Sequence, residues 1–426
     1  MAKKKTIQQS EPLVAIDLGS SGVKAMAAEI APDGLLRILG TEYSNKFECI
    51  ERGIVTNTSD AGFMINEVLR KLSNRVGVDA LPSAFVCVGG RTMQLASVPC
   101  HRDQVRKKEI ERYLLDEMEA ECKYKVETKY PDAAVLDVIP YYFTLDGKDQ
   151  DQEPTPDQKA MIVDGNYIVF VGKKELEQKV VDSFNRSAKR MERMYVRPDA
   201  LMNVLASDDE MRQGCAILDL GAQTTTLTVY KGNQYLYNKV VAMGGYDITR
   251  DVEQIGISLA YAEQLKCKYG MASPELVEVN HRFRIPSPTQ VGGEVAVMAT
   301  ELAEIIASRL DQIVKPLLEM LNKEASRFQI LYVTGGGAVL QGIIEYLQAR
   351  TPIQVMYGSH ASWLAEDTEE DMYMPSYSAL VGTLLLGANY REKHPMATSN
   401  GKGRLIDEIT NTLAKKTLEI FSDQNY

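Results

Sequence analysis

Two segments of the sequence contain the same kind of loop, one whose residues are suited to holding a phosphate group. Residues 13–30 (LVAIDLGSSGVKAMAAEI) and 215–232 (CAILDLGAQTTTLTVYKG) each pass from an apolar stretch through Asp-Leu-Gly and small polar residues into a second β-type stretch. Glycine lets the backbone approach an anion closely, and consecutive N–H groups can surround a phosphate. The hydroxyl donors of the two loops are Ser20, Ser21, Thr224 and Thr225.

An aspartate ends the first strand of each segment, Asp17 in one and Asp219 in the other. A carboxylate at this place can hold Mg²⁺ through the water shell of the metal, because Mg²⁺ dehydrates reluctantly. Two facing hairpins would then hold a nucleoside triphosphate between two halves of the molecule. Asp-x-Gly is frequent in ordinary turns, so two unrelated hairpins are the alternative. The shared order of strand, Asp-Leu-Gly, strand and turn favours an internal duplication.

A third motif is the glycine triplet in residues 330–341 (ILYVTGGGAVLQ), where an apolar strand runs into Gly335, Gly336 and Gly337. It is not the dinucleotide fingerprint GxGxxG, because Leu340 stands where the last glycine is required. The phosphate loop GxxxxGK(S/T) does not occur either. Alone, the triplet fits a tight strand-to-helix connection as well as a ligand site. Together with the two hairpins it predicts a contact with adenosine.

Composition excludes several other classes of protein. The chain has 426 residues and a net charge of −10, and at roughly 150 residues per domain we expect about three folding units. The acidic balance argues against nucleic acid as a partner, because neutralising phosphates requires clustered Lys and Arg. The six cysteines and four histidines lack the spacings of a zinc site or a HExxH motif. We expect neither a signal peptide nor a membrane span.

The order of the three motifs resembles the actin, Hsp70 and sugar-kinase superfamily, and within it the FtsA family of bacterial cell-division proteins. The resemblance covers residues 13–388. Its more specific stretches are Pro32-Asp33-Gly34 followed by Ile38-Leu39-Gly40, Arg52-Gly53-Ile54-Val55, Val88-Gly89-Gly90, residues 135–141 (VLDVIPY), residues 243–249 (MGGYDIT) and residues 262–266 (AEQLK).

The resemblance implies an α/β, actin-like fold of two lobes, ribonuclease H-like and duplicated, with a small inserted subdomain and a C-terminal amphipathic helix. It implies ATP and Mg²⁺ as cofactors, the metal being held through water by Asp17 and Asp219. Glu263 and Lys266 fall where the superfamily contacts ribose and adenine. The cofactor-binding residues implied in this way are Asp17, Gly19, Ser20, Ser21, Asp219, Gly221, Thr224, Gly244, Gly245, Glu263, Lys266, Gly335, Gly336 and Gly337.

The second loop departs from the family pattern Asp-x-Gly-Gly-Gly-Thr-x-Asp. Ala222 and Gln223 replace two glycines, and Thr226 replaces the final acid. Side chains at positions of close backbone approach narrow the geometry of the loop, and the lost acid removes a partner for Mg²⁺ or water. We therefore expect nucleotide binding with at most weak ATP hydrolysis, and the sequence identifies no catalytic residue.

The motifs and changes in composition divide the chain into predicted segments. These are 12–90, 166–212 and 366–390 for the first lobe, 91–165 for the insert, 213–250 and 325–365 for the core of the second lobe, 251–324 for its outer subdomain, 391–403 for a linker and 404–426 for the amphipathic helix. Within them we expect helices over 107–125, 258–268 and 294–321, a strand over 133–143 and a polar loop over 146–158. In FtsA the insert takes part in contacts between neighbouring molecules.

The C-terminal helix has no core of its own to join. Its apolar stripe consists of Leu405, Ile406, Ile409, Leu413 and Ile420, with Phe421 at the margin. A free amphipathic helix behind a polar linker favours a membrane surface or a partner groove. Over residues 404–421 its charges sum to zero, so binding to a membrane must depend on apolar burial. The resemblance to FtsA, which ends in a membrane-targeting helix, favours the membrane.

The resemblance implies a protein that polymerises on the cytoplasmic face of the cell membrane at the division site. There it would tether filaments of FtsZ, the tubulin-like division protein, by capturing the FtsZ C-terminal peptide in a lobe that includes Arg309. Two alternatives share the core fold. One is a PilM-like scaffold of a pilus machine, and the other is a phosphotransferase acting on a small molecule.

Overall fold

The computed structural model describes residues 11–150, 153–232, 234–286 and 293–394. The predicted helix over 404–426 and its membrane-facing residues lie outside this part. The described residues up to 387 form one compact unit, and residues 388–394 belong to a second unit. The sheets and the cleft described below belong to the first unit.

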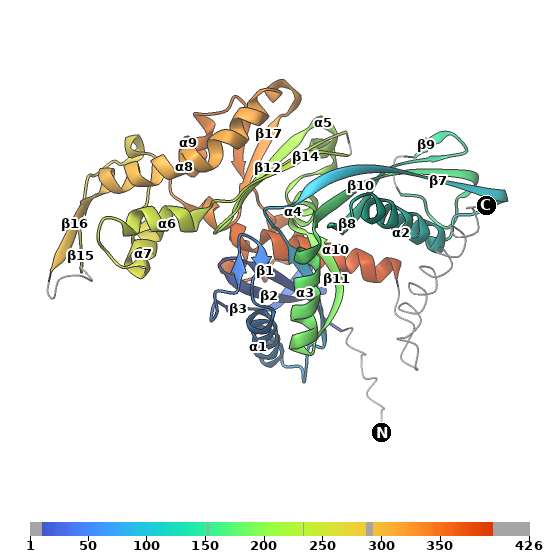
Figure 1. Ribbon diagram of the computed structural model, residues 1–426, viewed down its shortest axis with the longest axis horizontal. Helices are drawn as coiled ribbons and strands as arrows, with labels where there is room; N and C mark the ends of the chain where they lie inside the picture. The colour runs from blue at the N-terminus through green and yellow to red at the C-terminus, as the bar shows by residue number, and fades with distance from the viewer. Residues whose placement is uncertain (1–10, 151–152, 233, 287–292, 395–426) are drawn as a thin grey trace. The chain divides into compact units, whose positions relative to one another are not determined.

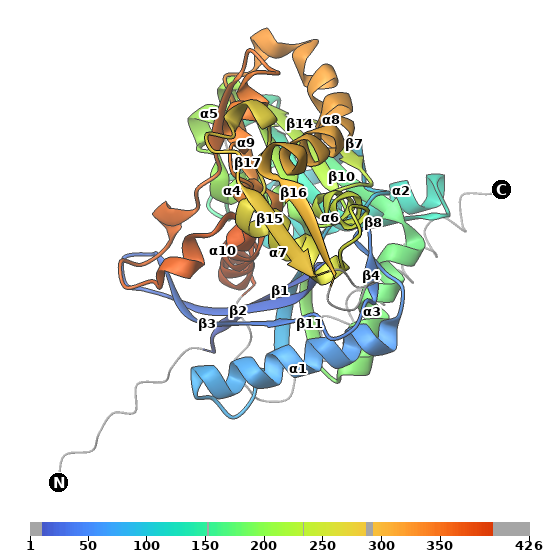
Figure 2. The same cartoon turned by 90° about the vertical axis from the view of Figure 1, so that its left-hand side faces the viewer.

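The first lobe is built on a five-stranded sheet in the order β11-β6-β1-β2-β3. Its strands are β1 (Leu13–Gly19), β2 (Gly22–Ile30), β3 (Leu36–Ser44), β6 (Ser83–Val88) and β11 (Arg190–Val196). Helix α1 (Thr58–Val76) lies against one face, and the beginning of α10 (Ser378–Lys393) lies on the other (Figure 2). Asn57 caps α1 by accepting from two backbone N–H groups, and α3 (Lys174–Ser187) packs beside α1.

The second lobe repeats this sheet. Its order is β14-β13-β12-β17-β18, formed by β12 (Cys215–Leu220), β13 (Thr225–Lys231), β14 (Gln234–Val241), β17 (Ile330–Thr334) and β18 (Gln354–Tyr357). In each sheet an antiparallel three-strand meander is followed by two parallel strands on the side of its first strand. Asp17 pairs with Lys24 across the first hairpin, as Asp219 pairs with Thr226 across the second. The predicted duplication is therefore confirmed.

The insert is a four-stranded sheet in the order β7-β10-β8-β9, with α2 (Arg112–Lys129) against it (Figure 1). The strands are β7 (Gln94–Glu109), β8 (Ala133–Leu145), β9 (Lys148–Gln150) and β10 (Lys159–Lys173). The helix predicted over 107–125 was wrong at its start, because residues 107–109 continue β7 and pair with β10. The predicted loop over 146–158 contains a hairpin, since Asp146 and Gly147 both adopt the positive φ of a two-residue turn. The predicted boundary at 165 falls within β10.

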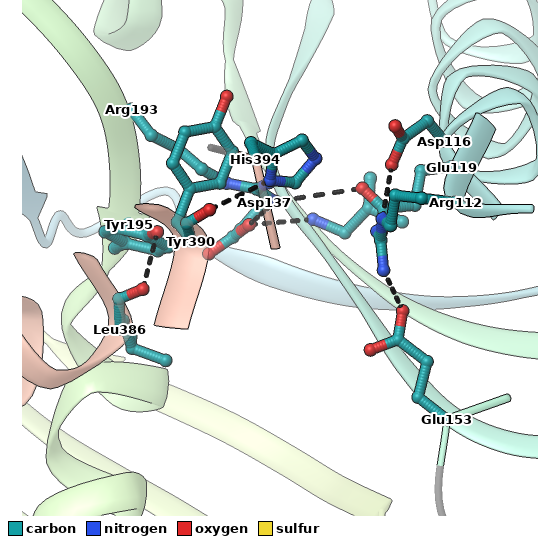
Figure 3. A network of polar contacts seen from close by, with 11 residues as sticks. Arg112, Asp116, Glu119, Asp137, Glu153, Arg193, Tyr195, Leu386, Tyr390 and His394 are labelled. Carbon is teal, nitrogen blue, oxygen red and sulfur yellow. Dashed lines mark hydrogen bonds and ion pairs between the residues drawn. The ribbon is translucent and has the colours of Figure 1, made fainter. Parts of the chain in front are cut away.

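Arg193 of β11 joins the insert to the first lobe. Its Nη2 lies 3.4 Å from Asp137 Oδ1 on β8 and 3.9 Å from Glu119 Oε2 on α2 (Figure 3). Within the insert, Arg112 holds Asp116 and Glu119 at 2.8 and 3.0 Å and also pairs with Glu153. The Asp137 carboxyl is buried, and this burial raises its pKa well above the usual range although Arg193 opposes the shift.

The outer part of the second lobe consists of α6 (Gly245–Glu253), α7 (Leu259–Tyr269), the hairpin β15 (Arg282–Pro286) and β16 (Glu294–Met298), and α8 (Ala299–Asn322). The helix predicted over 294–321 was wrong over residues 294–298, which pair with β15. There Val295 and Val297 alternate with Glu294 and Ala296, a period of two that fits a strand. Apolar residues of α8 pack against the second sheet.

The remaining elements connect these parts. They are the short pair β4 (Ile50–Glu51) and β5 (Ile54–Val55), with α4 (Arg197–Leu205), α5 (Asp208–Gln213) and α9 (Ile343–Gln348). Helix α10 continues to Lys393, so the linker predicted from residue 391 begins later than expected. Among the described residues, no helix combines the length and hydropathy needed to cross a membrane.

Candidate functional site

A cleft of about 1130 Å³ lies where the carboxyl ends of β1 and β12 meet. Every residue that the sequence implied for cofactor binding lines this cleft, from both hairpin loops, the Gly244-Gly245 turn, α7 and the glycine triplet. Its size is that of a ligand pocket. Residues almost 320 positions apart in the chain therefore converge on one space, as the duplication predicts.

The first loop connects β1 to β2 and is supported by the loop between β4 and β5. The Ser20 hydroxyl accepts a hydrogen bond from the Gly53 N–H at 3.0 Å, and the Tyr43 hydroxyl donates to the Ser21 carbonyl at 2.5 Å. Gly53 has a φ of 74°, and a Cβ there would stand 2.8 Å from the Gly90 Cα. The conformation of the first loop therefore depends on a close backbone approach that only glycine allows.

The second loop connects β12 to β13 and is supported by the turn before α6. The Gly221 carbonyl accepts from the Gly245 N–H at 2.9 Å, and the Ala222 carbonyl accepts from the Tyr246 N–H at 2.7 Å. A Cβ on Gly244 would lie 2.4 Å from the Gly221 oxygen. Gly244 thus acts by letting two backbones touch rather than by leaving open space for a ligand.

Gln223 links the two loops across the cleft. Its Oε1 accepts a hydrogen bond at 2.9 Å from the backbone N–H of Arg52, which directly precedes Gly53. The first loop contacts Gly53 through Ser20, so the two loops are joined through the Arg52-Gly53 turn. The substitution of glycine by Gln223 therefore adds a contact between the lobes as well as narrowing the loop.

Only the middle glycine of the triplet faces open space. Gly335 has a φ of 87°, and a Cβ there would lie 2.3 Å from Asp219 Oδ1, whereas a Cβ on Gly337 would lie 2.8 Å from the Leu220 Cβ. Both are required for close packing against the end of β12. A Cβ on Gly336 would meet no atom within 4 Å. Gly336 is therefore the member of the triplet with room for a ligand beside it.

Glu263 and Lys266 lie on α7 and form an ion pair with 2.7 Å between Nζ and Oε2. Lys266 Nζ also donates to the Gly245 carbonyl at 2.9 Å, so it ties α7 to the turn beside the second loop. Partial burial opposes ionisation of Glu263, but Lys266 and Thr249 outweigh it and lower the pKa of this carboxyl. Lys266 is held in the cleft wall with 12% of its side chain exposed, while the Glu263 side chain remains 50% exposed.

Arg197 reaches the two aspartates that were predicted to hold Mg²⁺. It begins α4 directly after β11, and its Nη2 donates to the Asp17 carboxylate while its Nε lies 3.8 Å from Asp219 Oδ2. Gly89 leaves room for it, because a Cβ there would lie 3.3 Å from the Arg197 Nε. Burial opposes the charge of Arg197, but the two carboxylates outweigh this effect and raise the pKa of the guanidinium.

This arrangement does not fit a hydrated Mg²⁺ held by Asp17 and Asp219. The guanidinium already takes up one Asp17 oxygen and stands beside Asp219, and a second cation would be repelled. We therefore assign no metal to this aspartate pair.

Sequence reasoning missed Lys24, Arg197 and Gln223 as parts of the cleft. Lys24 could have been found, since it lies opposite Asp17 in the hairpin register. In the structure its Nζ donates to the Ser376 carbonyl at 3.2 Å. Arg197 follows a strand that runs parallel to its neighbour β6, and the ends of parallel strands commonly carry binding residues. That strand was not predicted, so the signal could not be used.

Arg309 lies outside the residues that line the cleft. On α8 it forms a two-pronged ion pair with Asp251 of α6, with Nε and Nη2 at 2.6 and 2.7 Å from the two carboxylate oxygens. Its Nη1 also donates to Gln312 at 2.9 Å. In this structure its guanidinium therefore fastens α8 to α6, and its role in peptide binding stays a prediction.

Comparison with known proteins relates both halves of the cleft to one family. The family model for the cell division protein FtsA matches residues 216–382. FtsA of Enterococcus faecalis is 26% identical over 344 residues, which cover 79% of this chain and 76% of the relative. FtsA of Helicobacter pylori is 26% identical over 422 residues, covering 90% and 83%. The chain is thus similar in sequence to FtsA proteins over most of its length.

Solved structures show that this chain has the actin-like fold. A chain of the PilM-PilN type IV pilus biogenesis complex matches with a TM-score of 0.63 and 16% identity, covering 89% of this chain and 98% of the other. MreB 5 of Spiroplasma citri bound to AMPPNP matches with a TM-score of 0.55 and 11% identity, covering 90% and 98%. At these identities the likeness concerns the fold.

Proposed function

We propose that this chain is an actin-like, ATP-binding cell-division protein that polymerises on the cytoplasmic face of the cell membrane and tethers FtsZ filaments there. One observation carries the proposal: the residues implied by the FtsA resemblance, from two distant halves of the chain, line a single cleft. The similarity to proteins named cell division protein FtsA over most of the chain supports the same reading.

In the proposed complex the phosphates face the two hairpin loops and the adenosine lies beside Gly336. Backbone N–H groups and the hydroxyls of Ser20 and Thr224 are donors in the first and second loops. Glu263 and Lys266 stand in the wall where the ribose and adenine are expected. ATP is the proposed nucleotide, and the missing acid at Thr226 favours binding over rapid hydrolysis.

The proposed partners are a second copy of the chain, a membrane surface and the C-terminal peptide of FtsZ. The segment 404–426 is the proposed membrane anchor, through Leu405, Ile406, Ile409, Leu413, Ile420 and Phe421. The lobe formed by α6, α7 and α8 is the proposed peptide site. Arg309 would contact a peptide there only if it exchanged Asp251 for a peptide carboxylate, which a bidentate guanidinium can bind equally well.

Co-flotation tests this function as a whole. Purified chain and FtsZ are mixed with liposomes that contain anionic lipid, and both proteins are expected in the floated fraction. Removing 404–426 should leave both at the bottom of the gradient, because the proposed anchor is gone. Flotation of FtsZ to the same extent with the truncated chain, or without the chain, would reject the proposed tether.

A scaffold of a pilus machine is the second candidate, because the PilM-PilN structure gives the TM-score of 0.63. That likeness supports the fold alone, whereas the similarity in sequence is to FtsA. Failure to float FtsZ together with intact membrane binding of the full chain would favour this alternative.

A further inference from the structure

The floor of the cleft contains as many basic as acidic side chains, two of each. Two carboxyl groups, those of Asp17 and Asp219, and two basic groups, those of Arg197 and Lys24, lie there. Burial raises the pKa of the Asp219 carboxyl and lowers the pKa of the Lys24 ammonium, whereas at Arg197 burial is outweighed by the nearby carboxylates, which raise its pKa. Both aspartate side chains are nearly buried, at 6% and 10% exposed, and Arg197 is 20% exposed. A buried carboxylate pair requires a counter-charge nearby, and here an arginine from the same lobe as Asp17 supplies it.

We infer that Arg197 is the built-in cation of the cleft, so that a nucleoside triphosphate binds as the metal-free anion; the inference rests on the proposed nucleotide-binding function. An arginine presents several N–H donors in a fixed plane, so one edge can hold Asp17 while other donors stay available to a phosphate oxygen. Lys24, on the neighbouring strand, supplies a second positive charge on the same cleft floor.

The Arg197 side chain is held in a fixed position by contacts on several sides. It is held by a hydrogen bond to Asp17, by the contact with Asp219 and by the gap left at Gly89. Because Pro198 follows it at the start of α4, the backbone direction there is also restricted. Adding Mg²⁺ between the aspartates would displace this cation and leave it near the metal, which costs Coulomb energy.

Calorimetry of the full chain with ATP tests the inference in two buffers, one with excess EDTA and one with excess Mg²⁺. ATP is expected to bind in EDTA as tightly as in Mg²⁺ or more tightly, within a margin of about threefold, which is under 1 kcal/mol. Tighter binding in Mg²⁺ beyond that margin would overturn the inference while leaving the nucleotide-binding function intact. No binding in either buffer would reject the nucleotide-binding function and the inference with it.

Arg197→Gln supplies the complementary test. Without the guanidinium, the affinity for ATP in EDTA should fall by about tenfold or more and recover in Mg²⁺, because the aspartate pair becomes free for a metal. Mn²⁺ alone, followed by electron paramagnetic resonance, should bind this variant more tightly than the unaltered chain. Unchanged ATP affinity in EDTA, or unchanged Mn²⁺ binding, would contradict the inference.

Two further variants complete the design. Arg284→Gln removes the same charge from an exposed position on β15, at 68% exposed, and should alter neither ATP affinity nor Mn²⁺ binding. Arg197→Lys keeps the charge but loses the planar set of donors, and it serves if Arg197→Gln does not fold. Its affinity for ATP in EDTA should equal or exceed that in Mg²⁺ within the same margin of about threefold, and tighter binding in Mg²⁺ beyond that margin would count against the inference.

Discussion

Gly336 is the residue of the glycine triplet at which a side chain would enter the cleft without disturbing the fold. A Cβ added to Gly335 or Gly337 would clash with the end of β12, whereas a Cβ on Gly336 has open space around it. Replacing each glycine therefore distinguishes packing from ligand contact. The three positions look alike in the sequence and differ in their physical roles.

Gly336→Leu should lower ATP affinity by about tenfold or more, which corresponds to about 1.4 kcal/mol, because the larger side chain fills the space beside the proposed adenosine. The thermal unfolding temperature should change little. Calorimetry and a thermal melt measure the two effects. Ala361→Leu, at an exposed position outside the cleft lining, is the matched control. Full ATP affinity in Gly336→Leu would show that adenosine lies elsewhere.

Asp137 makes a second prediction at the scale of single residues. Burial raises the pKa of its carboxyl, so the folded protein keeps this proton over a range of pH in which the unfolded chain releases it. This carboxyl should therefore contribute a loss of stability as the pH rises from about 4 towards neutral. Asp137→Asn has no carboxyl at this position, so this contribution to the pH dependence of stability is absent from the variant.

The stability of Asp137→Asn relative to the unaltered chain should increase with pH by about 1.4 kcal/mol for each unit by which the pKa is raised. Urea unfolding at a series of pH values measures this slope. The lost contact with Arg193 adds a constant offset, so the slope is the quantity to compare. The exposed Asp367→Asn is the control and should give a much flatter line. A slope of zero or of opposite sign for Asp137→Asn would contradict the prediction.

Among the elements, the side chain of Gln223 links the second loop to the Arg52-Gly53 turn beside the first. Gln223 of the β12–β13 loop accepts from the Arg52 N–H, and nothing in the family pattern of glycines would have provided this contact. A hydrogen bond between neutral groups adds about 0.5–1.5 kcal/mol of net stability. Opening of the cleft must break it.

Gln223→Ala should therefore increase hydrogen exchange at the Arg52 amide and lower the free energy of unfolding by about 1 kcal/mol. The chain itself should stay folded, because the backbone contacts of the second loop with Gly245 and Tyr246 are unaffected. Exchange measured by mass spectrometry and urea unfolding provide the two readouts. The control is Gln254→Ala at an exposed position. Identical protection of Arg52 in both variants would exclude the link as a restraint on the cleft.

For the whole molecule, the sequence predicted the features that depend on local order along the chain. The two hairpins, the glycine triplet and the strand over 133–143 each have a pattern that is visible in a dozen residues. Since the hairpins start both sheets in the same way, the duplicated architecture followed from them. The cleft residues outside the hairpins and the glycine triplet were implied by the resemblance to the FtsA family.

Features that depend on partners distant in the sequence could not be predicted in this way. Residues 107–109 are charged and read as helical, but pairing with β10 makes them a strand. Residues 294–298 precede a long helix and are extended because β15 lies beside them. Arg197 contacts Asp17, which lies 180 positions earlier in the chain, and no local sequence pattern predicts a contact at that separation.

The join between β10 and α3 has a mechanical consequence. β10 ends at Lys173 and α3 begins at Lys174, so the insert continues into the first lobe without a flexible loop. Leu176 of α3 packs so tightly on Gly90 that a Cβ there would lie 2.8 Å from the leucine, and Gly90 in turn touches Gly53, whose N–H holds Ser20. A displacement of the insert would therefore reach the first hairpin loop through direct contacts, without a flexible connection between β10 and α3.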